Sequence, residues 1–465
     1  MTTLLLRADA GPSIGVGHLS RCVALAEAAV ARGWRVSLAG SVEGADWLLA
    51  RLSTLDVPVV APDDLLAADV VVVDHYELGE LPQLRAAARL VSLEDGPFGR
   101  RAADVVVDAN LAPAPRPADG SPLVLAGPRF APLRSEVVVA RGSRLSNAPR
   151  HPHGPPRVVV VMGGSAAAGA VSAALSALRE VDLPMTVRAI SPSPLAAPDA
   201  RFTVEPPTPR LPALLAEADL VISAAGVTLL ELCCLGVPAA VVRLADNQEA
   251  GYRAAVDQGL AVGLGGVADL PAAAPALRAL LTDPGRRTEL SRAASSVVDG
   301  RGADRILTAS TLTVRPATMA DAARLLAWRN DPDTLRWSRS HEPVAEPTHR
   351  EWLGSSLANP DRVLLIVESD HPLGTVRFDR DEPGTWEVGI TVAPADRGKG
   401  LAADLLMLGE AALLARYAPA RIVANVHEDN AASRTLFHHA GYEPSARPLD
   451  GPYRWLRKSC PQPGE

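Results

Sequence analysis

The chain has 465 residues, which is too many for one hydrophobic core and predicts two or three domains. Apolar residues make up 48% of the chain and charged residues 21%, the balance of a soluble globular protein. The net charge of −7 gives no electrostatic basis for binding nucleic acid or an anionic membrane, so neither is expected as a partner.

The cysteines and the N-terminal residues indicate the cellular compartment in which the protein is expected. The four cysteines (Cys22, Cys233, Cys234 and Cys460) include no CxxC pair, so neither a disulfide framework nor a metal site is expected. The first apolar run ends before Arg7 and is too short for a signal peptide, and no window is long enough to span a membrane. A cytoplasmic location is therefore expected.

Short apolar runs alternate with Ala/Leu-rich helical stretches in residues 1–140. A first strand at Leu4–Leu6 leads into a Gly-rich turn and a helix from about Ser20 to Arg32. Further strands are expected at Trp34–Ala39, Val70–Asp74, Leu90–Leu93 and Val105–Asp108. Continuous β-branched runs separated by helices are typical of a parallel sheet that is covered on both faces, so residues 1–140 are predicted to form a Rossmann-like domain.

Residues 141–157 are polar, basic and rich in proline, which predicts an interdomain linker. A second series of the same kind follows, with strands expected at Arg157–Met162, Met185–Ile190, Leu220–Ser223 and Ala239–Leu244. Residues 158–300 are thus predicted to form a second Rossmann-like domain. Two doubly wound domains place a ligand cleft at the carboxyl ends of their strands, between them.

From Leu312 the pattern changes to α+β with a mostly sequential sheet. A strand at Leu312–Arg315 and a helix at Met319–Arg329 come first. The later elements expected are strands at Arg362–Glu368, Gly374–Arg380, Trp386–Val392 and Arg421–Val426, with a helix at Leu401–Tyr417. Residues 312–458 are predicted to form a third domain.

The Gly-rich turn after the first strand is a candidate substrate site. Gly15 and Gly17 allow the backbone to approach a ligand, and Arg21 lies one turn into the helix that follows. His18, at a strand's carboxyl end, is predicted to point into the cleft and to act as a general base on water. The alternatives are a plain Gly-rich turn and a histidine with a structural role.

A second candidate site lies in residues 158–300. Gly164 and Ser165 follow the first strand of that series, and Gln248 follows a later one. Gly226 and Thr228 open a helix whose amides can hold a diphosphate, and Glu231 can accept hydrogen bonds from ribose hydroxyls. The alternative is a helix N-terminus with an incidental glutamate.

Six segments of residues 1–300 together resemble the family of UDP-2,4-diacetamido-2,4,6-trideoxy-β-L-altropyranose hydrolases of pseudaminic acid biosynthesis, relatives of the GT-B glycosyltransferases. The segments are RADAGPSIGVGHLSR, VVDHY, GPRFAPLRSE, MGGS, SAAGVTLLELCCLGVP and LADNQ. The resemblance implies a GT-B-like pair of domains and a metal-independent, inverting hydrolase. His18 then matches the catalytic histidine, Tyr76 and Asn247 match positions near the sugar, and the helix opened by Gly226 matches the UDP-binding signature.

Two segments depart from that family's pattern. The chain reads MGGS where the family tends to have FGGT, and Asp95 is followed by Gly and Pro where the family often carries a second acid. These differences concern the fit of the sugar more than the mechanism. UDP is a good leaving group, so a base for water and a helix N-terminus for the phosphates suffice.

The segment from Arg397 to Ala402, through Gly398, Lys399, Gly400 and Leu401, opens a predicted helix. The spacing Arg-x-x-Gly-x-Ala packs backbone amides around a pyrophosphate. A basic surface turn is the alternative. Downstream stand the segments NVHEDNAAS and FHHAGY, and together with the loop these resemble the GNAT acetyltransferase superfamily over residues 312–450.

The GNAT resemblance implies acetyl-CoA as co-substrate. It places the backbone at Ile390 and Val392 on pantetheine, the loop from Arg397 to Ala402 on the pyrophosphate, and Asn430 and Ser433 along the other side of the cofactor. Phe437 stands where many GNAT enzymes carry a tyrosine acid. Glu387 is the candidate base for the attacking ammonium, with His427 as the weaker choice; a salt-bridged strand residue is the alternative for Glu387.

The two resemblances fit consecutive steps of one pathway. Trp328-Arg329-Asn330 resembles the GNAT branch that acetylates nucleotide-linked amino sugars and protein N-termini. We therefore expect a bifunctional enzyme that acetylates a UDP-4-amino sugar and then releases UDP from the product. A glycosyltransferase or a non-catalytic sugar-nucleotide-binding half, or a protein N-terminal acetyltransferase, are the alternatives.

Overall fold

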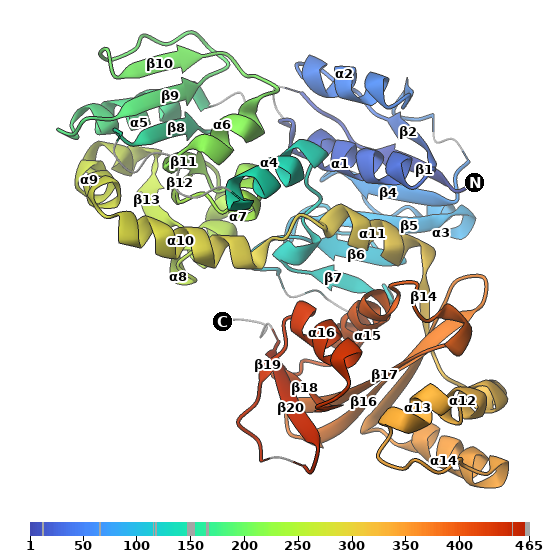
Figure 1. Cartoon of the computed structure of the whole chain (residues 1–465). Helices are drawn as coiled ribbons and strands as arrows, with labels where there is room; N and C mark the ends of the chain where they lie inside the picture. Colours follow the sequence, from blue (N-terminus) through green and yellow to red (C-terminus); the bar gives the residue numbers. More distant parts are fainter. Residues whose placement is uncertain are drawn as a thin grey trace. The chain divides into compact units, whose positions relative to one another are not determined.

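The computed structural model describes residues 1–11, 14–64, 67–114, 116, 119–146, 154–163, 167–448 and 450–460 (Figure 1). The chain divides into two compact units. The first unit is residues 1–114 with 125–307, and the second is residues 115–124 with 308–465. In the described part of the chain, no helix is long and apolar enough to cross a membrane.

The first sheet of the first unit has the strand order β3-β2-β1-β4-β5-β6-β7. From β3 to β6 each strand pairs in parallel with its neighbours, as the continuous apolar runs predicted. The strands are β1 (Thr3–Arg7), β2 (Arg35–Ala39), β3 (Val59–Val60), β4 (Val70–Asp74), β5 (Arg89–Glu94), β6 (Val105–Asp108) and β7 (Val124–Ala126). The helices between them are α1 (Gly17–Ala31), α2 (Asp46–Thr54), α3 (Pro82–Ala87), η1 (Pro128–Phe130) and α4 (Ser135–Ser146).

The second sheet has the order β10-β9-β8-β11-β12-β13, the doubly wound arrangement of Rossmann-like folds. Its strands are β8 (Arg157–Val161), β9 (Thr186–Ile190), β10 (Phe202–Glu205), β11 (Leu220–Ala224), β12 (Ala239–Arg243) and β13 (Val262–Gly266). Its helices are α5 (Ala167–Arg179), α6 (Leu211–Glu217), α7 (Val227–Leu235), η2 (Asp246–Gln248), α8 (Glu249–Asp257), η3 (Val267–Ala272), α9 (Ala274–Thr282) and α10 (Pro284–Val297), followed by α11 (Gly302–Thr311). A parallel α/β architecture is therefore confirmed for both sheets.

The first residues of the segment predicted as a linker are helical. Helix α4 continues through residues 141–146, and β8 begins at Arg157, the last residue of the segment. Residues 147–153 lie outside the described part of the chain. The domain boundaries at 140 and 158 remain a prediction.

The second unit contains a sheet of order β14-β15-β16-β17-β18-β20-β19. Its mostly sequential order confirms the α+β pattern expected after Leu312. The strands are β14 (Thr313–Pro316), β15 (Arg362–Glu368), β16 (Pro372–Glu382), β17 (Thr385–Val392), β18 (Arg421–His427), β19 (Glu443–Pro444) and β20 (Tyr453–Ser459). The helices are η4 (Met319–Asp321), α12 (Ala322–Arg329), α13 (Pro332–Trp337), α14 (Glu346–Ala358), η5 (Pro394–Asp396), α15 (Ala402–Arg416) and α16 (Ala431–His439) (Figure 1).

Buried strands position the polar groups of the first unit. Every residue of β4 is buried, and its last residue is Asp74. Burying the four valines before it holds the strand in place, because each apolar side chain removed from water stabilises the fold by about 1.5–3 kcal/mol. The carboxylate of Asp74 is thereby fixed at the carboxyl end of the sheet, the edge at which ligands bind in such folds.

Candidate functional site

A cavity in the first unit is lined by residues that follow strands of both its sheets. Arg21, Tyr76, Gly226, Asn247 and Gln248, all predicted from the sequence as site residues, contribute to its lining. Asp95, Asn110 and Leu111 are other lining residues, and sequence reasoning did not assign them a substrate role. The structure thus brings together side chains that are more than 200 residues apart in the chain.

Several other predicted site residues lie around this cavity without being among its lining residues. His18 is only 4% exposed, and Tyr76 contacts its ring edge-on, with 4.4 Å between ring centroids. The backbone at Gly17 approaches the N-terminus of α7, where an added Cβ would lie 3.5 Å from a methyl group of Val227. Gly15 has a φ of +81°, which glycine adopts without strain. Gly164 and Ser165 lie outside the described residues.

His18 is held by a buried carboxylate that sequence reasoning did not assign to it. The Nδ1 atom of His18 lies 2.5 Å from Oδ1 of Asp74, a residue with no exposed surface. Arg21 donates two hydrogen bonds to the same carboxylate, from Nε at 2.8 Å and from Nη2 at 2.7 Å. Burial by itself would raise the pKa of Asp74, but the Arg21 charge and the bond with His18 bring it below its usual range.

These contacts place a proton on Nδ1 of the His18 ring. An ionised Asp74 only accepts hydrogen bonds, so Nδ1 of His18 carries the proton and donates it. The nearby Nη2 of Arg21, 3.0 Å from Nδ1, instead donates to the carboxylate. The other ring nitrogen, Nε2, has no hydrogen bond within the described structure. This arrangement suits a general base.

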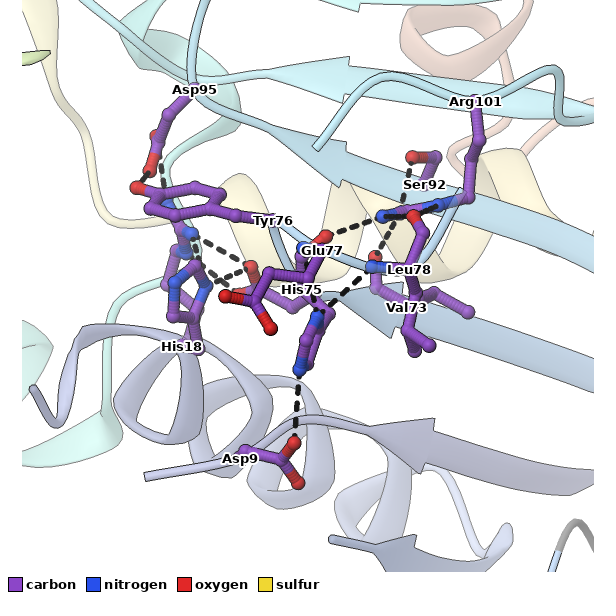
Figure 2. Close-up of polar contacts among 12 residues, drawn as sticks. Asp9, His18, Val73, His75, Tyr76, Glu77, Leu78, Ser92, Asp95 and Arg101 are labelled. Atoms are coloured by element: carbon purple, nitrogen blue, oxygen red, sulfur yellow. Dashed lines mark hydrogen bonds and ion pairs between the residues drawn. The ribbon is translucent and has the colours of Figure 1, made fainter. Parts of the chain in front are cut away.

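Tyr76 and Asp95 extend the same network toward the cavity. Figure 2 shows the Tyr76 ring beside His18, with its hydroxyl group directed at the Asp95 carboxylate. Asp95 also accepts a hydrogen bond from Nη1 of Arg21 at 2.8 Å. Burial and the negative charge of Asp95 raise the pKa of Tyr76, so its hydroxyl group stays protonated at neutral pH. Tyr76 therefore donates to Asp95 while its ring contributes to the cavity wall.

His75 follows the same strand but has a structural role. Its Nε2 atom lies 2.9 Å from Asp9, and its Nδ1 accepts hydrogen bonds from the backbone amides of Glu77 and Leu78 (Figure 2). Both ring nitrogens are thus engaged. The two adjacent positions, His75 and Tyr76, therefore serve different purposes.

The N-terminus of α7 forms another wall of the cavity. Gly226 precedes the helix in an extended conformation, and no side chain of a described residue caps the helix there. Its amides are thus available to an anion, as predicted for Gly226 and Thr228. Glu231, expected to accept from a ribose, is 5% exposed, and its Oε1 accepts a hydrogen bond from Arg134 at 3.1 Å. The ribose role of Glu231 remains a prediction.

In the second unit, two central strands part at the position of Glu387. Strand β17 pairs with β16 as far as Val392, but with β18 only from Thr385 to Glu387. Beyond that point the backbone of β17 that faces β18, including Ile390, is left without strand partners among the described residues. Such an edge can pair with an extended ligand that carries amide groups.

The loop before α15 has the conformation expected of an anion-binding turn. Gly398 and Gly400 have φ values of +77° and +80°, and no described atom lies within 4 Å of a Cβ built on either. The Arg397 side chain does not lie free in this loop: it donates to Oδ1 of Asp331 at 2.5 Å and to Thr334. Lys399 pairs with Asp396 at 2.7 Å. The predicted pyrophosphate contacts of this segment, Leu401 and Ala402 included, would therefore come chiefly from its backbone.

Two further predicted cofactor residues form a helix cap. Asn430 caps α16, and its Oδ1 accepts a hydrogen bond from the amide of Ser433 at 3.0 Å. The cap stabilises the helix whether or not a cofactor is bound. Phe437, in the same helix, is buried and packs on Tyr442, whose hydroxyl group donates to Glu410.

Glu387 lies where the strands part and has the character of a base. Burial raises its pKa, an effect that the charges of Arg377 and Arg339 only partly offset. A carboxylate with a raised pKa accepts protons more readily at neutral pH than an exposed one. The alternative role for Glu387, a salt-bridged strand residue, is not supported, because none of the described ion pairs includes Glu387.

Comparisons with known proteins bear on this second unit. Residues 311–443 match the model of the acetyltransferase (GNAT) domain. No curated protein matches the chain. Three solved structures are similar over 32% of the chain: a putative acetyltransferase from Salmonella typhimurium with its cofactor acetyl-CoA (22% identity, 94% of that chain, TM-score 0.27), a ribosomal-protein-alanine N-acetyltransferase from Brucella melitensis (22%, 99%, 0.27), and a spermidine N-acetyltransferase from Vibrio cholerae in complex with CoA and spermine (18%, 96%, 0.29).

The family match covers most of the second unit, including the parting strands and the glycine loop. The C-terminal part of this chain, residues 311–443, is a GNAT acetyltransferase domain.

Proposed function

We propose that the chain is a bifunctional enzyme of nucleotide-sugar metabolism. The GNAT domain transfers the acetyl group of acetyl-CoA to the amine of a UDP-4-amino sugar, and the first unit hydrolyses the diacetamido product to release UDP. The observation that carries the second activity is the buried contact between His18 and Asp74 beside the cavity. The two Rossmann-like domains form a GT-B-like pair in this proposal.

In the hydrolytic step, Nε2 of His18 takes a proton from water. The water oxygen attacks the anomeric carbon as the bond between that carbon and the UDP oxygen breaks, and UDP leaves as the anion. The uncapped N-terminus of α7 supports this assignment, since its amides stabilise phosphate charge. Tyr76 and Asn247 line the cavity and are the groups proposed to hold the sugar.

In the acetyl transfer, the amine nitrogen attacks the thioester carbon and CoA leaves as the thiolate. Glu387 takes the proton that the amine loses, directly or through a water. Since Phe437 carries no proton to donate, the thiolate takes its proton from water. Acetyl-CoA would occupy the opening between β17 and β18, with Ile390 and Val392 on pantetheine and the glycine loop on the pyrophosphate.

The test is to incubate the full chain with acetyl-CoA and a panel of UDP-amino sugars, and to follow the products by mass spectrometry. We expect free CoA, a sugar heavier by one acetyl group, and UDP without any added acceptor. UDP release only in the presence of a sugar acceptor would indicate a glycosyltransferase instead. Binding of the UDP-sugar without turnover would indicate a binding module, and acetylation of peptides alone would indicate a protein N-terminal acetyltransferase.

Glu387→Gln should slow acetyl transfer by about 10²–10⁴-fold, since a general base contributes that much. In the wild type, kcat/KM for the amine should fall as the pH drops through the raised pKa of Glu387, because the protonated carboxyl group cannot accept a proton. The variant should lack this acid limb. Both effects are measured from the initial rates of CoA release between about pH 5 and about pH 9.

The matched control for this variant is Glu443→Gln, an exposed glutamate of β19 in the same sheet. It should leave the rate and the pH profile unchanged, and both variants should keep the wild-type KM for acetyl-CoA. An unaltered pH profile in Glu387→Gln would remove Glu387 from the proton route.

A further inference from the structure

Asn425 lies beside the opening between β17 and β18. Val423 of β18 pairs with Glu387 of β17, and this is the last pair before the strands part. Paired residues share a face of a sheet, and so do residues two apart on one strand. The side chains of Asn425 and Glu387 are therefore on the same face, on opposite sides of the opening.

The amide of Asn425 has one partnered and one unpartnered end. Its Nδ2 donates to Oδ2 of Asp450 at 3.3 Å. Its Oδ1 is buried and has no hydrogen-bond partner within the described part of the chain. A buried acceptor without a donor destabilises the protein, so a ligand that donates a hydrogen bond to this atom should bind more tightly than one that cannot.

Asp450 determines which atom of the Asn425 side-chain amide has no hydrogen-bond partner among the described residues. A carboxylate accepts hydrogen bonds and does not donate them, so the NH₂ group of Asn425 must face Asp450 and the oxygen must face away. Asp450 is itself held by Nη2 of Arg339 at 2.6 Å. Arg339 and Asp450 thus act on the orientation of Asn425 as positioning residues.

The next residue on this face is His427, which has a different environment. Its Nδ1 accepts a hydrogen bond from the amide of Asp429, and its ring packs against Trp337 and Tyr453. The carboxylate of Glu387 and the amide oxygen of Asn425 are therefore oxygen acceptors on this face of the sheet, and the guanidinium of Arg377, which pairs with Gly389, lies on the same face.

We propose that Oδ1 of Asn425 accepts a hydrogen bond from the acceptor amine during acetyl transfer. The proposal rests on the acetyltransferase activity proposed above and adds a substrate-binding residue to it. An amine has enough N–H groups to donate to Asn425 and to give a proton to Glu387, and still directs its lone pair at the thioester once deprotonated. A hydroxyl group has a single hydrogen and cannot serve both oxygens, so the arrangement selects amines over alcohols.

Asn425→Leu tests this directly, since leucine has a similar size and offers no acceptor. With the full chain, the UDP-4-amino sugar and acetyl-CoA, we expect kcat/KM for the amino sugar to fall about 10- to 100-fold, the size of a lost hydrogen bond to a charged or reacting group. KM for acetyl-CoA should stay within about twofold of wild type, because the cofactor contacts are backbone groups elsewhere. The matched control is Asn359→Leu, whose Oδ1 accepts from the amide of Asp361 at the end of α14.

A second variant keeps the test valid if the leucine variant folds poorly. The double variant Asn425→Asp with Asp450→Asn exchanges the two groups, so that an amide at 450 donates to a carboxylate at 425, which still presents an oxygen to the amine. In the single variant Asp450→Asn, two amides face each other, so the amide of Asn425 is no longer held in one orientation and kcat/KM for the amine should fall. We expect the double variant to recover most of this lost kcat/KM.

Three outcomes separate this proposal from the proposed function. If the wild type acetylates no UDP-amino sugar but acetylates spermidine or a peptide, the proposed substrate is wrong, and the Asn425 variants are then measured with the amine that reacts. If Asn425→Leu and Asn359→Leu have the same kcat/KM for the reacting amine, the role of Asn425 is refuted. If Asn425→Leu raises KM for acetyl-CoA as much as for the amine, the effect is structural and the role is likewise refuted.

Discussion

His18→Ala should reduce UDP release by about 10²–10⁴-fold, the contribution of a general base, and leave acetyl transfer within about twofold of wild type. The reason is the free Nε2 atom, which alanine removes from a ring whose Nδ1 is fixed on Asp74. The two activities are measured in one reaction, as UDP and as CoA, so each preparation carries its own control for folding. Loss of both activities in a folded protein would refute the two-site proposal.

The alternative for His18 is a structural role without any part in catalysis. His75→Ala provides the comparison, because both ring nitrogens of His75 are already engaged by Asp9 and backbone amides. Thermal unfolding of the two variants should show the larger loss of stability for His75→Ala, and UDP release the larger loss of rate for His18→Ala. The opposite ranking in both measurements would assign His18 to the structure.

Asp74→Asn should lower UDP release by about 10²–10⁴-fold although the histidine itself is untouched. An asparagine that turns its NH₂ group toward His18 would have to donate to Nδ1, which moves the ring proton to Nε2 and removes the base. An asparagine that turns its oxygen toward His18 loses a bond from Arg21, because the NH₂ group cannot accept. Either orientation disturbs the base, so kcat should fall while acetyl transfer stays unchanged.

Asp74 should also contribute stability that depends on pH. Its pKa lies below the usual range in the folded chain because Arg21 and His18 favour the carboxylate, so its contribution is present at neutral pH and is lost on acidification. The difference in melting temperature between wild type and Asp74→Asn should therefore shrink between pH 7 and about pH 3. A difference that grows on acidification would contradict the assignment of an ionised Asp74.

Asp69→Asn is the matched control for Asp74→Asn. Asp69 precedes the other end of β4, where its carboxylate accepts hydrogen bonds from the amide and hydroxyl groups of Thr3. The same chemical change there should affect stability without changing UDP release. If both variants lose UDP release equally, Asp74 has no specific effect on His18.

Much of the local structure could be predicted from the sequence because it depends on neighbours in the chain. The valine run that ends at Asp74 predicted a fully buried strand with the bounds that β4 has. The segment from Arg397 to Ala402 was predicted to open a helix, and α15 begins at Ala402. Strands β14 to β18 of the second unit were likewise predicted within a few residues, because each apolar run is long enough to indicate its own element, whereas β19 and β20 were not predicted.

The sequence by itself therefore determined two parallel α/β sheets, a mostly sequential third sheet and the glycine loop of the GNAT domain. Only the tertiary structure decided which polar groups meet. Asp74 reaches His18 across 56 residues, and Arg397 turns to Asp331 across 66, because strand order and helix packing place those segments side by side. Asn425 is left with an unpartnered oxygen because Asp450, which is 25 residues further on, engages its nitrogen. Contacts of this kind depend on the three-dimensional path of the chain, and no local periodicity or spacing encodes them.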